Sequence, residues 1–484
     1  MIQAYAVADV RVAEQAAMAS LPEGELMRRA AAGLAEVVRA RLRPGGRVVA
    51  LVGAGDNGGD ALYAVARLAG AGVPAAVVTV AGGAHRAGLA AAEGAGAEVA
   101  ALLPEATGAA YRLVGEADLV IDGVYGIGGR PGLPAAVSGL LDQVPAKATV
   151  VAVDLPSGTD PSGERLASET VFADETVTFG VPKPVHLLPL TEPAVGRLTI
   201  VDIGVTVDAQ PVVQRLTDDD VADQWPRPGP SSDKYSRGVL GVVAGGESYT
   251  GAALLCVTAA VCAGVGMVRY VGPPTPTMLL RAAVPEAVHG AGRVQAWVVG
   301  SGLDSQDDSP HGREQREAAV AALGSGEPCV VDAGGLDLIG EPRDTPTLLT
   351  PHAGELARML SRFGPAVDRS AVQAAPLAHG HRLADATGCT VLLKGHTVLV
   401  VPPGGGTARS QADGPAWLAT AGSGDVLAGI AGALLAGGLD PLAAGSVAAH
   451  VHGRAGEAAN PGGPVRALAV AHAVPAVVAG MLRR

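Results

Sequence analysis

The chain has 484 residues, of which 48% are hydrophobic and only 3% aromatic, and its formal net charge is −12. This length suits two or three domains rather than a single core, and the hydrophobic content is sufficient for large cores. Because the charge is negative and no basic run appears, the composition excludes an extended nucleic-acid surface and favours small ligands in local pockets.

The N-terminus carries charges from Asp9 onward and has no unbroken apolar stretch, which argues against a signal peptide. The longest uncharged run, residues 248–268, predicts a buried helix running into a strand rather than a membrane span. We therefore expect a cytoplasmic protein without a membrane partner. Four scattered cysteines without metal-ligand spacing predict buried free thiols: Cys256, Cys262, Cys329 and Cys389.

The first half alternates helical and strand patterns. Residues 12–42 form an Ala-rich helical region that is broken at Pro22-Glu23-Gly24. This alternation is typical of a mostly parallel sheet with helices on both faces, which binds ligands at the carboxyl ends of its strands. Apolar runs predict strands near residues 48–52, 75–80, 119–121, 150–153 and 176–179.

A glycine-rich loop, residues 53–60, follows the first of these strands and precedes a helix at residues 61–69. Strand, glycine-rich loop and helix is the layout of a nucleotide site, although the spacing differs from the usual dinucleotide fingerprint. Taken alone, the loop is equally compatible with a tight turn. Polar turns also follow two later strands, at Asp122-Gly123 and at residues 154–158.

Residues 206–232 predict a linker, because prolines from Pro226 to Pro230 stiffen the chain and block regular structure. We place the domain boundary near residue 215. The second half repeats the alternation of strands and helices. Strands are predicted at residues 239–243, 296–299, 329–331, 347–349, 390–393 and 398–401, and helices from Thr250 and at residues 426–435 and 442–458.

The most informative run, residues 419–429, reads Ala-Thr-Ala-Gly-Ser-Gly-Asp-Val-Leu-Ala-Gly. A helix that starts after such small residues can hold a phosphate with its backbone N–H groups and its positive end. Asp425 would then lie at the mouth of the helix and take a proton from a hydroxyl that attacks a phosphoryl group. The alternative is that Asp425 is an ordinary N-cap.

Three segments of the first half, residues 53–60, 122–129 and 154–158, together resemble the NAD(P)H-hydrate epimerase domain, also called the YjeF N-terminal domain. The resemblance covers residues 1–215 and implies an α/β, Rossmann-like three-layer domain. It also implies that hydrated NAD(P)H binds at Asp56, Asn57, Gly58, Gly59, Asp60, Gly126, Ile127, Gly128, Gly129, Arg130, Pro131, Gly132 and Asp154.

By the same resemblance, Asn57, Asp122 and Ser157 bind a potassium ion (K⁺), which hard oxygen donors suit. Asp154 would contact the substrate and is the candidate acid or base. Asp56 departs from the family, which usually has Asn there. An extra carboxylate near the pyrophosphate is unfavourable unless it points away or meets a cation.

The second half, residues 216–484, resembles the ADP-dependent NAD(P)H-hydrate dehydratase, which has a ribokinase-like α/β fold. Asp233 departs from this pattern, because the family usually has His before the lysine. Five segments match in order: residues 234–238 leading into 245–253, then 299–303, 350–355, 393–397 and the Gly-Ser-Gly-Asp run.

This resemblance implies that the C6 hydroxyl of the S form is phosphorylated with ADP and Mg²⁺, so that phosphate becomes the leaving group. Asp425 would activate the hydroxyl, and backbone N–H groups of residues 422–424 would stabilise the phosphoryl charge. Taken alone, the Pro-His-Ala-Gly-Glu segment is more often a capped helix start. The implied substrate residues are Ala253, Gly302, His352 and Asp425, and the implied nucleotide residues are Lys394, Gly395, His396 (backbone only), Thr397, Val398 and Gly424.

Together the halves would repair both NADHX and NADPHX, since the epimerase interconverts the R and S forms. Two other interpretations stay open: a ribokinase-like small-molecule kinase, and a non-catalytic N-terminal nucleotide-binding module. Residues 249–253 and 351–352 favour the dehydratase, and Asp122 with Asp154 favours an active N-terminal half. The sequence leaves open a homo-oligomer, the preference between NADHX and NADPHX, the strictness for ADP, and channelling.

Overall fold

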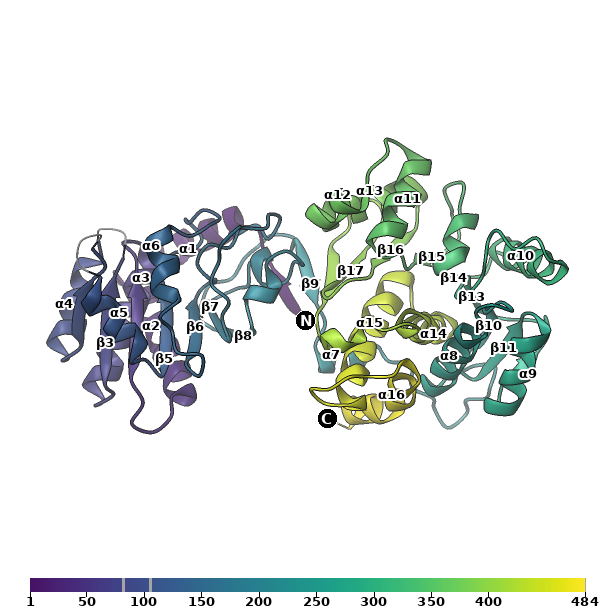
Figure 1. Ribbon diagram of the computed structural model, residues 1–484, viewed down its shortest axis with the longest axis horizontal. Helices are drawn as coiled ribbons and strands as arrows, with labels where there is room; N and C mark the ends of the chain where they lie inside the picture. Colours follow the sequence, from purple (N-terminus) through teal and green to yellow (C-terminus); the bar gives the residue numbers. More distant parts are fainter. Residues whose placement is uncertain (81–82, 104–106, 484) are drawn as a thin grey trace. The chain divides into compact units, whose positions relative to one another are not determined.

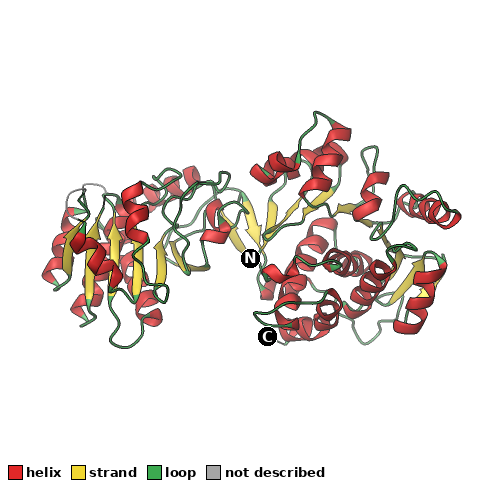
Figure 2. Cartoon of the chain, in the orientation of Figure 1, coloured by secondary structure: helices red, strands yellow, loops and turns green. Residues whose placement is uncertain are grey.

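The structure of the protein, a computed structural model, describes residues 1–80, 83–103 and 107–483. These residues form two compact units, one of Gln3–Val213 and one of Gln214–Arg484 together with Met1–Ile2. In both units strands form a central sheet and helices pack against it (Figures 1 and 2). The predicted α/β class is confirmed.

The unit Gln3–Val213 contains a seven-stranded sheet, in which every neighbouring pair is parallel, with strand order β4-β3-β2-β5-β6-β7-β8. Its strands are β2 (Val48–Val52), β3 (Ala75–Thr79), β4 (Glu98–Ala101), β5 (Leu119–Gly123), β6 (Thr149–Val153), β7 (Glu175–Phe179) and β8 (Arg197–Val201). Its helices are α1 (Val7–Ser20), α2 (Glu25–Arg41), α3 (Asp56–Gly70), α4 (Arg86–Gly94), α5 (Gly108–Gly115) and α6 (Ala135–Leu141), with short 3₁₀ turns at Pro184–His186 and Glu192–Ala194.

Strand β2 explains why this sheet has helices on both faces. All five of its residues are buried. Val48, Ala50 and Val52 pack with α2 and α3, whereas Val49 and Leu51 point to the other face and pack with α5 and α6. A strand that is apolar on both sides is stable only between two helix layers, as expected for a parallel sheet.

The other unit contains an eleven-stranded sheet of order β1-β9-β18-β17-β16-β15-β14-β13-β10-β11-β12. In this order, every neighbouring pair from β16 to β12 is parallel. The pairs β16-β17 and β17-β18 are antiparallel. The strands are β1 (Ile2–Ala4), β9 (Val213–Arg215), β10 (Val239–Val243), β11 (Met267–Val271), β12 (Val288–His289), β13 (Ala296–Val299), β14 (Cys329–Val331), β15 (Thr347–Leu349), β16 (Thr390–Leu393), β17 (Val398–Val401) and β18 (Ala408–Gln411).

The core of this unit lies where three apolar helices, α8, α14 and α15, pack against the sheet and a fourth, α16, packs against these helices. Gly429 allows α14 to approach α8, because a Cβ there would lie 2.2 Å from the carbonyl oxygen of Cys256. The helices are α7 (Asp218–Gln224), α8 (Thr250–Cys262), α9 (Pro274–Ala283), α10 (Pro310–Leu323), α11 (Ala353–Phe363), α12 (Arg369–Ala374), α13 (Pro376–Thr387), α14 (Ser423–Ala436), α15 (Pro441–Ala459) and α16 (Ala467–Leu482), with 3₁₀ turns at Ala333–Leu338 and Ala416–Leu418.

The predicted linker is partly wrong. Strand β9 and helix α7 lie inside residues 206–232, so this segment is not free of regular structure. The three aspartates at 218–220 form the first turn of α7, where Thr217 accepts a hydrogen bond from the Asp220 N–H and Asp220 bonds back to Thr217. Carboxylates at a helix N-terminus are stabilised by the helix dipole, so the acidic run starts a helix.

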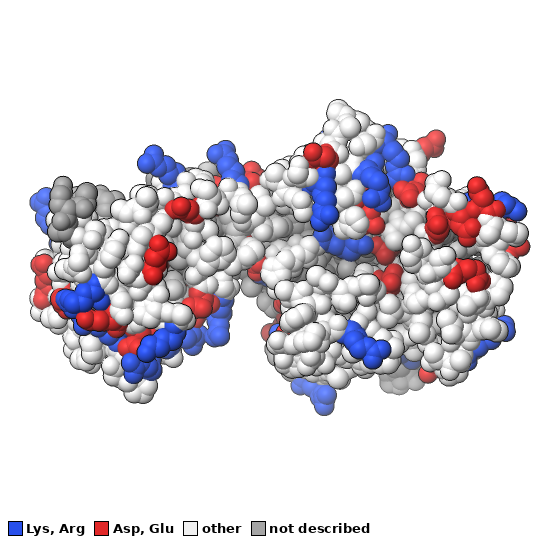
Figure 3. Space-filling model, viewed as in Figure 1, with Lys and Arg blue, Asp and Glu red and all other residues white. Residues whose placement is uncertain are grey.

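All four cysteines are free, and three are buried, while Cys262 is half-buried. None of the helices in the described ranges is both long and apolar enough to cross a membrane. On the face drawn in Figure 3, Lys and Arg lie in separate small groups rather than in one continuous basic surface.

Candidate active sites

The first candidate site lies at the carboxyl ends of β5 and β6. Asp122 pairs with Ala152, so both strands end at the same level. Helix α3 begins nearby at Asp56, and the Asn57 amide donates a hydrogen bond to the carbonyl oxygen of Val153 at 2.6 Å. This bond ties the first turn of α3 to the end of β6.

Two of the three side chains predicted to bind potassium, Asp122 and Ser157, are in direct contact, and the half-buried Asn57 is linked to them through Tyr125. Ser157 Oγ donates to Asp122 Oδ1 at 2.6 Å, and both residues are fully buried. Tyr125 connects Asn57 to Ser157, because its carbonyl oxygen accepts from Asn57 Nδ2 at 3.2 Å and its N–H donates to Ser157 Oγ at 2.9 Å. Burial raises the pKa of Asp122, although the hydrogen bonds from Ser157 oppose the rise.

Asp154 follows β6 directly and forms a buried ion pair with Lys183. Its carboxylate also accepts a hydrogen bond from Thr178 Oγ1 at 2.9 Å. Burial alone would raise the pKa of Asp154, but the charges of Lys183 and His186 and the hydrogen bonds from Lys183 and Thr178 together outweigh it, so the pKa is lowered. The Nδ1 atom of His186 accepts a hydrogen bond from the backbone N–H of Lys183 at 2.9 Å. Burial lowers the pKa of His186 to about 4. Asp154 is therefore an ionised carboxylate with a neutral imidazole beside its partner.

Further carboxyl groups face this ion pair. Asp60, on the first turns of α3, is buried, and burial followed by the charges of Asp154 and Asp56 raises its pKa well above the usual value. Glu14 of α1 also faces the pair, and burial raises its pKa while Lys183 opposes the rise. Asp56, which replaces the asparagine usual in the family, is exposed at the start of α3.

The loop at residues 126–132 packs against the same turn. A Cβ on Gly126 would lie 2.2 Å from Asn57 Oδ1, so only glycine allows this approach. Arg11 of α1 donates to the carbonyl oxygen of Ile127 at 3.1 Å. Within the loop, Gly128, Arg130 and Pro131 are exposed.

The second candidate site lies at the start of α14. The N-cap is Gly422, with φ 88°, and no side chain caps the helix. Asp425 lies in the first turn, so the interpretation of Asp425 as an ordinary N-cap is wrong. Ser423 is buried, and its Oγ lies 3.2 Å from His452 Nε2. Burial lowers the pKa of His452 to about 4.

Lys394 lies beside this helix start and is held by Asp332. Its Nζ forms an ion pair with Asp332 Oδ1 at 2.8 Å, and a Cβ on Gly424 would lie 3.5 Å from that Nζ. Asp332 is buried and also accepts hydrogen bonds from Thr350 Oγ1 at 2.8 Å and Ser301 Oγ at 3.1 Å. The ammonium is thereby directed to the place where the helix start would receive a phosphoryl group.

The surroundings of Asp425 raise the pKa of its carboxyl group. Burial and then the charge of Asp332 raise its pKa to about 6, against the opposing charge of Lys394 and a hydrogen bond with Ser301. Lys394 keeps its proton, because Asp332 and Glu355 outweigh the effect of burial and raise its pKa.

His352 has the capping role that the sequence pattern allows. It is the N-cap of α11, and its Nδ1 accepts from the N–H groups of Gly354 at 3.0 Å and Glu355 at 3.2 Å. Its side chain is 54% exposed. Glu355 Oε2 lies 3.7 Å from Lys394 Nζ, so His352 stands at the rim of the same site.

The remaining predicted residues surround this site. Residues 395–397 form the turn between β16 and β17, with Gly395 and His396 exposed, Thr397 buried, and Val398 beginning β17. Ala253 and Gly302 both flank Gly245: a Cβ on Gly245 would lie 2.7 Å from Ala253 Cβ, and one on Gly302 would lie 3.1 Å from Gly245 Cα. Asp233 caps a turn instead, accepting from the N–H groups of Tyr235 and Ser236 at 2.8 Å.

Sequence reasoning missed Asp332, Lys183 and Glu14. A signal for Asp332 existed, because it follows a buried strand directly, as Asp154 does. Lys183 stands between two prolines in a chain with only four lysines, which was a second signal. Nothing in the sequence near Glu14 indicates that α1 faces the site.

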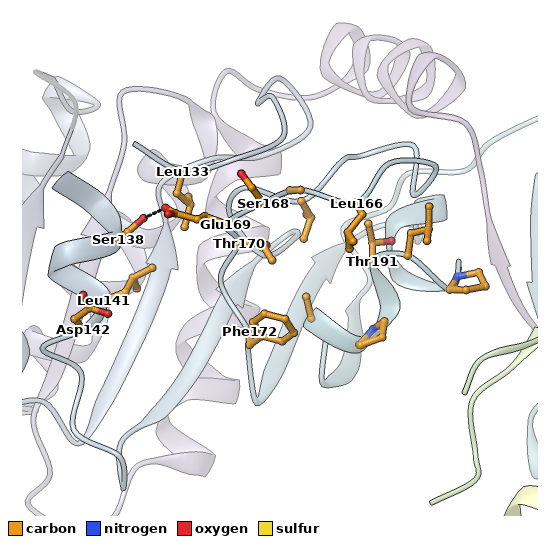
Figure 4. Close-up of a pocket in the computed structure, with 16 residues that line it drawn as sticks. Leu133, Ser138, Leu141, Asp142, Leu166, Ser168, Glu169, Thr170, Phe172 and Thr191 are labelled. Atoms are coloured by element: carbon orange, nitrogen blue, oxygen red, sulfur yellow. Dashed lines mark hydrogen bonds between the residues drawn. The ribbon is translucent and has the colours of Figure 1, made fainter. Parts of the chain in front are cut away.

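A cavity of about 600 Å³ in the unit Gln3–Val213 lies between α6 and the loops at residues 166–172 and 189–194 (Figure 4). None of the predicted site residues lines it. Its wall is mainly apolar, with Leu166 and Phe172 exposed, and Ser138 Oγ donates to Glu169 there.

Two protein families match the chain. The family described as YjeF-related protein N-terminus matches residues 23–185, and the family described as NAD(P)H-hydrate dehydratase matches residues 240–472. A solved structure of ADP/ATP-dependent NAD(P)H-hydrate dehydratase from Bacillus subtilis, co-crystallised with ATP and Mg²⁺, is 23% identical, with a TM-score of 0.49. It covers 56% of this chain and 99% of its own.

Two curated relatives are similar to this chain over most of its length. The bifunctional NAD(P)H-hydrate repair enzyme of Mycobacterium tuberculosis is 44% identical over 460 residues, covering 90% of this chain and 89% of the relative. The enzyme of the same name from Mycobacterium leprae is 44% identical over 480 residues, covering 95% and 94%. Identity at this level across both units decides the matter: the chain belongs to the family of bifunctional NAD(P)H-hydrate repair enzymes.

Proposed function

We propose that residues 1–215 interconvert the R and S forms of hydrated NAD(P)H, and that residues 216–484 dehydrate the S form with ADP, giving NAD(P)H, AMP and phosphate. The observation that carries the second activity is the meeting of Lys394, Gly424 and Asp425 at the start of α14. Because its substrates are small soluble nucleotides, we place this activity in the cytoplasm.

In the dehydration step, Asp425 takes the proton of the C6 hydroxyl as its oxygen attacks the β-phosphorus of ADP. The N–H groups of the Gly-Ser-Gly turn and the ammonium of Lys394 stabilise the charge on the transferred phosphoryl group. Phosphate then leaves C6, and loss of a C5 proton restores the reduced nicotinamide. Glycine at 422 and 424 keeps the turn open for the phosphoryl group, and His352 contacts the substrate from the rim.

Mg²⁺ fits this site as a partner of the nucleotide. It usually binds through one or two carboxylates and the substrate phosphates. Across residues 1–80, 83–103 and 107–483, no group of three or more His, Cys, Asp or Glu is placed to hold a metal ion. We therefore expect Mg²⁺ to enter with ADP and to supply charge neutralisation there.

The residues at Asn57, Asp122 and Ser157 fit a potassium ion. They offer amide, carboxylate and hydroxyl oxygens, and the carbonyl oxygens of Tyr125 and Val153 converge where the Asn57 N–H group now points. Hard oxygen donors in such a set suit a cation of this kind. When bound, the ion would balance the buried charge of Asp122 and fix the loops around the substrate.

A test of the whole function uses a mixture of R and S hydrates with ADP and Mg²⁺, following the absorbance of reduced nicotinamide together with free phosphate. Full recovery of NAD(P)H with one phosphate released per turnover is the expected result. A small-molecule kinase would instead accumulate a phosphorylated product without phosphate release. No recovery of NAD(P)H would rule out the repair function.

Dehydration is expected to lose activity as the pH falls below the pKa of Asp425, which is about 6. Only the ionised carboxylate accepts the hydroxyl proton, so kcat/KM should be level above this pH and fall about tenfold per pH unit below it. The Asp332→Asn variant loses the charge that raises this pKa, and its midpoint should move to lower pH. A midpoint that stays unchanged in that variant would contradict this account.

A fragment of residues 207–484 is expected to fold and to dehydrate the S form only. It keeps β9 and α7, and of the eleven-stranded sheet it loses only the three-residue strand β1. A fragment of residues 216–484 also loses β9, including the fully buried Val213, and should unfold at a lower temperature. Consumption of both forms by the longer fragment at enzymatic rates would contradict the division of activities.

A further inference from the structure

Asp60 is a buried carboxyl group that the dehydration chemistry does not use. It is 7% exposed, and in the described part of the chain no hydrogen bond or ion pair engages its side chain. It lies one helical turn after Asn57, whose amide is bonded to Val153, the residue before Asp154. Asp60 and Asp154 therefore face the same end of the sheet from α3 and from β6.

The two carboxyl groups differ in their partners. Asp154 has the buried ammonium of Lys183 and the hydroxyl of Thr178. Asp60 has neither, and burial together with Asp154, Asp56 and Glu14 makes its ionised form unfavourable. Two acids whose surroundings favour opposite protonation states are the usual arrangement for a general base and a general acid.

The surroundings are also rich in negative charge. Asp60 interacts electrostatically with Asp154, Asp56 and Glu14, and both Asp60 and Glu14 interact with the buried ammonium of Lys183. Because Lys183 is 1% exposed and bound to Asp154, it is not available to the substrate. Even with Asp60 protonated, the other carboxyl groups outnumber this one ammonium, so the site favours positive charge that develops on a bound molecule.

We propose that Asp60 is the general acid of the epimerisation, and that the reaction passes through a cyclic iminium cation formed by loss of the C6 hydroxyl. This inference rests on the proposed function of residues 1–215. Asp60 gives its proton to the C6 hydroxyl, the C6–O bond breaks, and the N1 lone pair forms the C6=N1 bond. One water molecule leaves.

Water then adds to the opposite face of C6, and Asp154 takes the proton that this water loses as the C6–O bond forms and the N1 lone pair is restored. The proton returns from Asp154 to Asp60 through solvent, so one water is lost and one gained with no change of oxidation state. Opening of the ring at the C6–N1 bond is the alternative. It builds up no cation: a base would take the hydroxyl proton, an acid would protonate N1, and the original oxygen would stay on C6 as an aldehyde.

The test measures R-to-S interconversion by the full chain in H₂¹⁸O without ADP, so that dehydration is idle, with an enzyme-free control for spontaneous exchange. We expect one ¹⁸O at C6 for each inversion, seen by mass spectrometry of the separated forms. Inversion without label would overturn the proposal, and this measurement needs no variant.

The Asp60→Asn variant keeps the size and neutrality of the side chain but has no proton to give. Its kcat for inversion should fall by about 100-fold or more with KM little changed, while it dehydrates the S form normally. A raised KM with kcat retained would mean that Asp60 only binds substrate, and would overturn its role. Glu93→Gln, an exposed charge loss on α4, serves as the control. A wild-type chain that dehydrates the S form but never inverts the R form would refute the epimerase function, and this step with it.

Discussion

Asp425→Asn is expected to lower the turnover of dehydration by about 100-fold or more while nucleotide binding largely survives. The amide keeps the size of the side chain but cannot take the proton of the C6 hydroxyl. The fold should not suffer, because Gly422 and not Asp425 is the N-cap of α14. Removing a buried carboxylate whose pKa Asp332 raises should also relieve repulsion. Loss of this charge beside the phosphates should, if anything, tighten ADP binding slightly.

The measurement compares single-turnover rates with the S form and ADP affinity by calorimetry. Asp440→Ala is a matched control, because Asp440 is a true N-cap that accepts from the Ala443 N–H at 2.9 Å. That variant should lose about 1 kcal/mol of stability and keep its turnover. A turnover of Asp425→Asn within about threefold of the wild type would mean that another group is the base, since the loss falls short of a general base's contribution.

The central strands and the long helices could be predicted from the sequence because each has a strong local signal. The predicted strands at residues 48–52 and 239–243 agree with β2 and β10 to the residue. Both are runs without polar side chains that have a glycine at one end, Gly53 after β2 and Gly238 before β10, and such runs are typical of fully buried parallel strands. Helix α14 could be predicted equally well from the sequence, because an apolar stretch follows the glycine turn.

Short or partly exposed strands could not be predicted in the same way. Strand β4 is only partly buried and begins with Glu98, and β9 has three residues inside a segment rich in proline and aspartate. Their pairing depends on a neighbouring strand far along the chain, which no local pattern reveals. The expected linker was wrong for this reason.

Part of each candidate site depends on backbone strain and on distant partners. In the described residues only Asp154 and Ala333 combine a side chain with a positive φ, at 64° and 46°. One is the proposed acid–base residue of the first unit, and the other follows Asp332, which holds Lys394 in the second. Strain of this kind persists where surrounding contacts require it, and it is concentrated at functional sites. A sequence shows neither the angle nor the partner.

Asp154→Asn is expected to lower epimerisation by about 100-fold or more and to leave dehydration of the S form unchanged. The variant must be Asn rather than Ala, because Asp154 is the buried partner of Lys183. Removing a partner of a buried ion pair costs about 3–5 kcal/mol. Asn still offers an oxygen to Lys183 and Thr178, and it tolerates a left-handed backbone better than Ala does.

The assay supplies an excess of the chain's own dehydratase activity with ADP and Mg²⁺ and follows both forms by chromatography. The S form should disappear at the wild-type rate, and the R form should remain at its slow spontaneous interconversion. Thermal unfolding of Asp154→Asn and Asp154→Ala separates the loss of chemistry from the loss of the ion pair, with Ala expected to be the less stable. If Asp154→Asn consumes both forms at the wild-type rate, Asp154 does not act as acid or base, and the ion pair with Lys183 has only a structural role.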